Sequence, residues 1–109
     1  MANQWTVSFL NEAVLGELEQ QPGDVRASFL RISELIAANG LENMREPYVK
    51  PLQGKIWEMR LKGRDGIARA LYVTATGRRV VVVRVFTKKT QKTPDHEIKL
   101  ALRRAKEVK

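Results

Sequence analysis

The stretch Val80-Val81-Val82-Val83-Arg84-Val85-Phe86 decides the fold, and it runs directly into Thr87-Lys88-Lys89-Thr90-Gln91-Lys92-Thr93-Pro94. An unbroken run of β-branched residues is typical of a strand that is covered on at least one face. The lysines, threonines and glutamine that follow carry hydrogen-bond donors suited to phosphate oxygens. The sequence therefore predicts a buried strand that ends in a cationic segment, and we expect the functional site at this junction.

Two more strands are predicted before this one. From Ile56 onward apolar side chains alternate with charged ones, so the apolar set is expected in the core. The apolar set is Trp57, Met59 and Leu61, and the charged set is Glu58, Arg60 and Lys62. Residues 67–74 form the next strand, with turns at 63–66 and 75–78, which gives a three-stranded antiparallel meander. In the last strand Arg84 and Lys88 share a face if no bulge intervenes.

Helical patterns flank the meander. A strand over residues 5–10 precedes a helix capped by Asn11, and a break at residues 20–23 leads to a second helix over residues 24–39. Residues 41–54 include two prolines and are predicted to form a loop. Thr93 as the cap and Pro94 as the first helical residue open a closing helix. This order predicts an α+β fold whose helices pack on one face of a twisted antiparallel sheet and leave the other face open.

Charge is segregated along the chain. Residues 1–49 carry three cations and seven carboxylates, whereas residues 50–92 carry twelve lysines and arginines and only two acids, Glu58 and Asp65. The whole chain has a net charge of +8. A surface that served solubility alone would mix the two signs more evenly. We therefore favour a polyanionic partner, a nucleic acid, over a basic surface without a partner.

Length and composition limit the remaining possibilities. The 109 residues are expected to form one domain. The sequence has no cysteine, so disulfides and zinc-thiolate sites are excluded. The first residues lack the pattern of a signal peptide, and the longest apolar run is far too short to span a membrane. We expect a cytoplasmic protein with no membrane partner.

Few residues are available for chemistry. No pattern indicates a Ser-His-Asp triad, a glycine-rich phosphate loop or a metal site, so we expect no metal and no cofactor. Glu58 is a general base or an orienter of neighbouring arginines, or it is only a cross-strand partner of Arg69 or Arg84. Arg69 lies between apolar residues, so it is expected at an exposed face or paired within a site. Any hydrolytic chemistry must use Arg, Lys and Glu.

Three segments together resemble a known family. They are Pro51-Leu52-Gln53-Gly54-Lys55-Ile56-Trp57-Glu58-Met59-Arg60, Gly66-Ile67-Ala68-Arg69-Ala70-Leu71-Tyr72 and Phe86-Thr87-Lys88-Lys89-Thr90-Gln91-Lys92-Thr93-Pro94. They resemble the HigB-like, phage-derived branch of the RelE/ParE toxin superfamily over nearly the whole chain. Members are toxins of toxin-antitoxin pairs. Most RelE and HigB toxins cleave messenger RNA in the ribosomal A site, whereas ParE toxins poison DNA gyrase.

The resemblance implies a single RelE-like domain over residues 1–109 and a set of site residues. The family's central-strand arginine, which contacts the scissile phosphate, matches Arg69, and the basic residue on the preceding strand matches Arg60. The basic pair after the last strand matches Lys88 and Lys89. Glu58 stands where RelE has a second lysine, and the family's C-terminal tyrosine or histidine has no counterpart because the chain continues into a helix.

The resemblance leads us to expect a metal-independent, ribosome-dependent mRNA endonuclease that inhibits translation. Its catalytic residues are expected among Glu58, Arg60, Arg69, Lys88 and Lys89. Further cations are expected to bind the nucleic acid: Lys50, Lys55, Lys62, Arg64, Arg84 and Lys92. The expected partners are mRNA, the ribosome and a cognate antitoxin of the helix-turn-helix class. The alternatives are a gyrase-inhibiting ParE-like toxin and a basic nucleic-acid-binding regulator.

Overall fold

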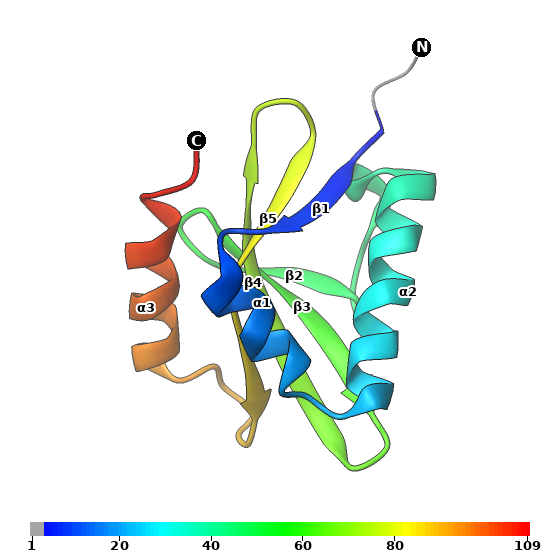
Figure 1. Ribbon diagram of the computed structural model, residues 1–109, viewed down its shortest axis with the longest axis vertical. Coiled ribbons are helices and arrows are strands. Elements are labelled where there is room, and N and C mark those ends of the chain that lie inside the picture. The colour runs from blue at the N-terminus through cyan, green and yellow to red at the C-terminus, as the bar shows by residue number, and fades with distance from the viewer. Residues whose placement is uncertain (1–3) are drawn as a thin grey trace.

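The structure is a computed structural model that describes residues 4–109 (Figure 1). Its elements are β1 (Thr6–Phe9), α1 (Glu12–Glu19), α2 (Gly23–Asn39), the 3-10 helix η1 (Leu41–Asn43), β2 (Val49–Gln53), β3 (Ile56–Gly63), β4 (Gly66–Ala75), β5 (Arg79–Lys88) and α3 (Asp95–Ala105). The strands form one sheet in the order β1-β5-β4-β3-β2. β1 pairs with β5 in parallel, and the other pairs are antiparallel. The predicted α+β class and the central meander are confirmed.

Local signals set the ends of the first two helices. The Asn11 side chain accepts a hydrogen bond from the Val14 amide at 3.1 Å, which caps α1 as predicted. α2 ends at Gly40, whose φ of 87° lies in the region that favours glycine, and the Gly40 amide still donates to the Ile36 carbonyl at 2.8 Å. No helix in residues 4–109 is long and apolar enough to cross a membrane.

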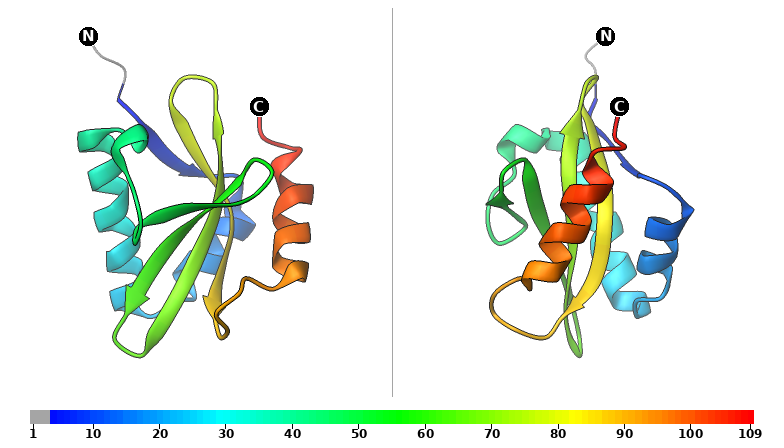
Figure 2. Two further views of the ribbon diagram at one scale, coloured as in Figure 1. Left: turned by 180° about the vertical axis from the view of Figure 1, so that it is seen from behind. Right: turned by 90° about the vertical axis from the view of Figure 1, so that its left-hand side faces the viewer.

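Helices cover both faces of the sheet, so the expectation of one open face was wrong. In Figure 1, α2 and α3 lie on opposite sides of the strands. One core packs under α1 and α2, and its largest members include Ile32, Ile36 and Tyr72. The other packs under α3 and includes Leu71 and Val83. Figure 2 shows α3 crossing the sheet on its own side, so only the part of this face beyond α3 stays uncovered.

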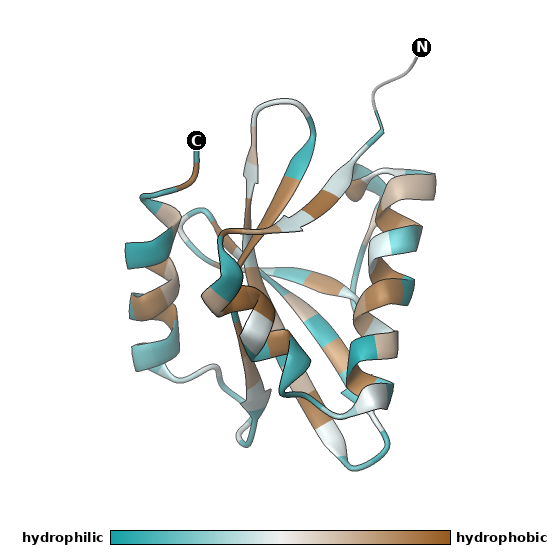
Figure 3. Ribbon diagram, in the orientation of Figure 1, coloured by the Kyte–Doolittle hydropathy of each residue, from teal (hydrophilic) through white to brown (hydrophobic). Residues whose placement is uncertain are grey.

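The buried tract of β5 supplies both cores. Val80 and Val82 belong to the core under α1 and α2, whereas Val81 and Val83 belong to the core under α3. Figure 3 shows hydrophobic colour along this strand and alternating colour along α2. A strand covered on both faces explains why apolar residues run without interruption here. The sequence predicted cover on at least one face of this strand, and the structure shows that both faces are covered.

Two further sequence expectations were wrong in this half of the molecule. Residues 41–54, predicted to be a loop, contain η1 and the edge strand β2. Proline lacks an amide donor, and Pro51 is tolerated because β2 pairs only with β3. Trp57, assigned to the core, is 38% exposed and lies opposite Pro51 of the edge strand β2.

Candidate nucleic-acid interface

The strand register gathers the predicted cations on the sheet face beyond α3. Arg60 on β3 lies directly opposite Arg69 on β4, and Ile67 lies opposite Lys88 on β5. Lys50 on β2 lies opposite Glu58. Directly opposed residues of an antiparallel pair point to the same side of the sheet. Cations from four strands therefore converge on one surface, although they are far apart in sequence.

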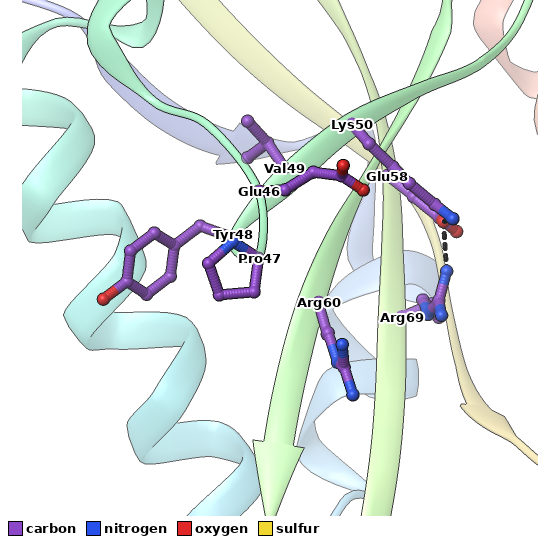
Figure 4. A pocket seen from close by; sticks show the side chains of 8 residues that line it. All are labelled: Glu46, Pro47, Tyr48, Val49, Lys50, Glu58, Arg60 and Arg69. Carbon is purple, nitrogen blue, oxygen red and sulfur yellow. Dashed lines mark hydrogen bonds and ion pairs between the residues drawn. The ribbon is translucent and has the colours of Figure 1, made fainter.

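A buried ion pair lies at the centre of this surface. The Arg69 guanidinium donates to Glu58 Oε1, and the two residues are only 4% and 1% exposed. Figure 4 shows the two side chains facing each other from neighbouring strands. Of the partners considered for Glu58, the structure selects Arg69. The pair is buried, so the small energy of an exposed cross-strand pair does not apply to it.

Both oxygens of the Glu58 carboxylate are occupied. Lys50 Nζ lies 3.3 Å from Oε1, and the Thr93 hydroxyl donates to Oε2 at 2.9 Å. The prediction that Thr93 caps α3 was wrong, because its hydroxyl faces Glu58. The helix begins at Asp95, and Pro94 is its N-cap instead of its first residue. The segment that follows β5 is tied to β3 through this bond. Glu58 thus holds Arg69, Lys50 and the Thr93 segment in place.

Arg69 binds Glu58 and also lines the cavity beside it. It borders a cavity of about 210 Å³ with Arg60, Lys50 and Tyr48 (Figure 4). Its buried Nε has no hydrogen-bond partner within residues 4–109. Arg60 is exposed, and no described carboxylate lies within ion-pair distance of it. Both guanidiniums are therefore positioned to bind an anion that enters this cavity.

A larger hollow of about 550 Å³ continues from this cavity toward the end of β5. It brings Lys88 and Lys89 to the same surface as Lys50, Arg60 and Arg69. We call the two hollows together the cationic cleft, defined by Lys50, Glu58, Arg60, Arg69, Lys88 and Lys89. All five predicted catalytic residues lie in it. Five cations around one buried carboxylate leave a strong positive charge for a phosphodiester backbone.

Other predicted nucleic-acid-binding residues lie outside the cleft. Lys62 is exposed on β3 at the end of the sheet face that carries Arg60, and Arg64 lies in the turn after β3. Lys55 lies in the turn between β2 and β3, beside the C-terminal residues. Lys92 is exposed in the segment between β5 and α3. Their binding roles stay predictions.

Arg84 lies outside the cleft. Leu71 opposes Arg84 and Tyr72 opposes Val82, so a bulge inserts Val83 just before Arg84. No register shift separates Arg84 from Lys88, so the two share a face of β5 as the unbroken alternation predicts. The Arg84 Nε donates to Glu97 at 2.6 Å, and its Nη1 lies 3.0 Å from Glu17. The hydrogen bond that Arg84 donates to Glu97 is the main cause of the raised pKa of Arg84. Its guanidinium therefore joins α1 to α3 and is not directed into the cleft.

Sequence reasoning missed several residues of the cleft. Tyr48 and Glu46 contribute to its wall from the segment before β2, and Thr90 and Gln91 contribute from the segment after β5. Thr90 and Gln91 belong to the polar segment after β5 that first indicated a site, so the sequence carried a weak indication of their position in the cleft. Glu46 and Tyr48 lie in the segment predicted to be a loop, where Tyr48 was expected to be anchored but neither residue was assigned to a site. Within residues 4–109 no three His, Cys, Asp or Glu residues group so as to hold a metal ion.

Known proteins share this architecture. A family model described as "Phage derived protein Gp49-like (DUF891)" matches residues 16–106. A double arginine mutant of the E. coli toxin RelE in the free state is 16% identical with a TM-score of 0.59, over 93% of this chain and 97% of that one. The RelE of an archaeal RelE-RelB complex from Pyrococcus horikoshii OT3 is also 16% identical, with a TM-score of 0.58 over 79% of this chain and 97% of that one. No curated protein is significantly similar. The chain therefore belongs to the Gp49-like family of phage-derived proteins, and its fold is that of the RelE toxins.

Proposed function

We propose that this chain is the toxin of a toxin-antitoxin pair and acts as a metal-independent, ribosome-dependent mRNA endonuclease of the HigB-like type. The observation that carries the proposal is the buried Glu58–Arg69 pair at the base of the cationic cleft. An arginine held by a buried carboxylate keeps one position, and Arg60, Lys88 and Lys89 surround it. The Gp49-like family and the RelE fold support a toxin.

The cleft suits cleavage of RNA by its own ribose 2′-hydroxyl. In-line attack of that oxygen on the adjacent phosphorus releases the hydroxyl proton to solvent water and forms a 2′,3′-cyclic phosphate. The bond from phosphorus to the 5′-oxygen breaks, and that oxygen must gain a proton. Negative charge grows on the non-bridging oxygens in the transition state, and preorganised cations stabilise it. Arg69 and Arg60 supply these cations. Lys88 or Lys89 is the proposed proton donor to the leaving oxygen.

Glu58 is better suited to positioning than to proton transfer. Its two oxygens are occupied by Arg69, Lys50 and Thr93, and it is 1% exposed. A general base must come within hydrogen-bond distance of the hydroxyl that it deprotonates. The cleft therefore supplies positive charge but few groups suited to general acid-base catalysis. An enzyme of this kind depends on accurate substrate placement, which a ribosome that holds the message can supply.

The proposed partners follow from the same function. A toxin of this type requires a cognate antitoxin, and the archaeal relative was solved with RelB. We propose an antitoxin of the helix-turn-helix class, encoded in the neighbouring reading frame. mRNA and the ribosome are the proposed targets, and the cytoplasm is the proposed compartment.

The test compares cleft variants in single-turnover cleavage of ribosome-bound mRNA. Arg69→Ala is expected to slow cleavage by roughly two to three orders of magnitude, the loss typical of one removed oxyanion donor. Because Arg69 is buried, Arg60→Ala serves as a second variant that leaves the buried pair intact. The control is Arg31→Ala, an exposed arginine on α2, which should cleave like the wild type. Melting temperatures separate loss of chemistry from loss of folding.

Three results would refute the proposal. The first is a folded Arg69→Ala or Arg60→Ala protein that cleaves at the wild-type rate. The second is equal cleavage of naked and ribosome-bound RNA, which would remove the ribosome from the mechanism. The third is growth arrest in which DNA synthesis stops before labelled amino acid incorporation falls, as expected of a gyrase inhibitor.

A further inference from the structure

A second pocket lies on the other side of the sheet edge from the cationic cleft. Its volume is about 330 Å³, and its lining includes Trp5, Met44, Arg45, Trp57 and Tyr72. We call it the aromatic pocket. Its size is within the range of sites that hold small organic groups. The proposed cleavage reaction does not use it.

Two hydrogen-bonding groups in this pocket have no partner. The indole Nε1 of Trp5 and the hydroxyl of Tyr72 are buried, and neither forms a hydrogen bond within residues 4–109. Tyr72 as a whole is 0% exposed. Burial raises the pKa of the Tyr72 hydroxyl, so it keeps its proton at neutral pH and can donate. Buried polar groups without partners are rare in folded proteins, and these two indicate a missing acceptor.

An aromatic ring lies at the mouth of the same pocket. Trp57 is 38% exposed and lies directly opposite Tyr72 on the neighbouring strand, so the two rings occupy the same side of the sheet. Exposing part of the apolar indole to water is unfavourable, and the exposed part presents a flat aromatic face. Flat aromatic faces of this kind stack with nucleobases irrespective of base identity.

The aromatic pocket is continuous with the cationic cleft. A hollow across β2 is lined by Lys50 and Val49, which also border the cleft, and by Met44, Arg45 and Trp57, which also border the aromatic pocket. Arg45 and Lys50 provide cations along this path. Glu46, which is exposed, adds one acid to the path. A strand of RNA can therefore pass around the sheet edge from one site to the other.

We propose that the aromatic pocket binds one nucleobase of a single-stranded RNA whose backbone lies in the cationic cleft. The base stacks on Trp57, and its carbonyl oxygen or ring nitrogen accepts hydrogen bonds from Trp5 and Tyr72. A base matches these features better than an apolar peptide side chain, since only the base brings ring acceptors together with a flat face. The identification of RNA rests on the proposed function, whereas the unpartnered donors do not.

Intrinsic fluorescence tests the proposal directly. Trp5 and Trp57 are the two tryptophans of the chain, and both line the aromatic pocket. The probe is a five-nucleotide, single-stranded, 2′-O-methyl RNA, which cannot be cleaved through its 2′-oxygen. Saturable quenching of the tryptophan fluorescence is expected. Among oligonucleotides that lack the base at one position in turn, one should lose most of the quenching.

Variants identify which groups bind the base. Trp57→Ala should weaken binding about 5- to 100-fold, the range for one base stacked on an aromatic ring, whereas Trp57→Phe should retain most of it. Tyr72→Phe should weaken binding about 2- to 10-fold, as expected for one hydrogen bond. Its melting temperature should not fall, because the hydroxyl has no partner to lose. Leu30→Ala on α2, which alters an exposed apolar residue elsewhere, is the matched control.

The outcomes separate this proposal from the proposed function. Oligonucleotide binding that is salt-dependent and weakened by Arg60→Ala, but without a change in tryptophan fluorescence, would overturn the base site and leave the nuclease proposal standing. Quenching that is equal for intact and abasic oligonucleotides would also overturn it. If the product of the neighbouring antitoxin frame quenches the fluorescence and the RNA does not, the occupant is a peptide and the proposal is wrong.

Discussion

Glu58→Gln tests whether the cleft is organised around a buried charge. The substitution keeps the shape of the side chain and an oxygen that can accept from Arg69, but it removes the negative charge. Arg69 then stays 4% exposed without its counter-ion. We expect the folded protein to survive with lower stability, and Arg69 to lose its fixed position.

The size of the effect follows from burial. Removing one partner of a buried ion pair costs about 3–5 kcal/mol. The lower end, about 3 kcal/mol, is expected here because the amide oxygen still accepts a hydrogen bond and because the Lys50 side chain is 43% exposed. For a chain of 109 residues, an unfolding entropy of about 2.1 cal/mol/K per residue converts this loss into a fall in melting temperature of roughly 10–15 °C.

Thermal unfolding monitored by circular dichroism measures this difference. The matched control is Asp95→Asn, which breaks the ion pair with Lys99 at 3.3 Å on the surface of α3. Both side chains of that pair are more than two-thirds exposed, so the melting temperature should change by no more than about 2 °C. If Glu58→Gln behaves like this control, the pair does not carry a buried charge, and Glu58 does not hold Arg69 in position.

Two more predictions concern the end of the sheet that carries the turn after β3. A Cβ at Gly63 would lie 2.7 Å from a methyl of Val25, so Gly63→Ala should lower the free energy of unfolding by about 1–3 kcal/mol in urea titrations. A Cβ at Gly16 in α1 would meet no atom within 4 Å, so Gly16→Ala should raise the free energy of unfolding by about 0.5–1 kcal/mol. The Asp24 carboxylate accepts from the Arg64 amide, which lowers the Asp24 pKa. This bond stabilises the fold above the unfolded pKa of about 3.9 and is lost as the pH falls through the lower folded pKa, so acid titration should destabilise the wild type more than Asp24→Asn.

Because of the buried pair, several residues of the cleft cannot be substituted independently of one another. Lys50, Arg69 and Thr93 all meet the Glu58 carboxylate, so a change in any of them alters the surroundings of the other two. Residues that share one network do not act additively. The exposed Arg60 has no such bond and can be changed alone. This difference makes Arg60 the better probe of phosphate contact and Arg69 the better probe of positioning.

The sequence by itself determined the local elements of this protein. The Val80–Val83 tract, the Asn11 cap and the Gly40 terminus were all predicted, because each depends on residues within a few positions of itself. The resemblance to RelE-type proteins also singled out Arg60 and Arg69, and both line one cavity. The first three features depend only on nearby residues, and the two arginines were identified by resemblance to a family. None of them required knowledge of how the helices and strands pack together.

Tertiary structure decided which of these residues meet. Thr93 lies 35 positions from Glu58, and nothing near either residue shows that the hydroxyl faces the carboxylate and does not cap α3. Arg84 binds Glu97 on α3 and Glu17 on α1, whereas Glu58 binds Arg69 from the neighbouring strand. Such contacts depend on how α1, α3 and the strands pack together. The cationic residues of the cleft could therefore be read from the sequence, whereas the buried pair that organises them required the fold.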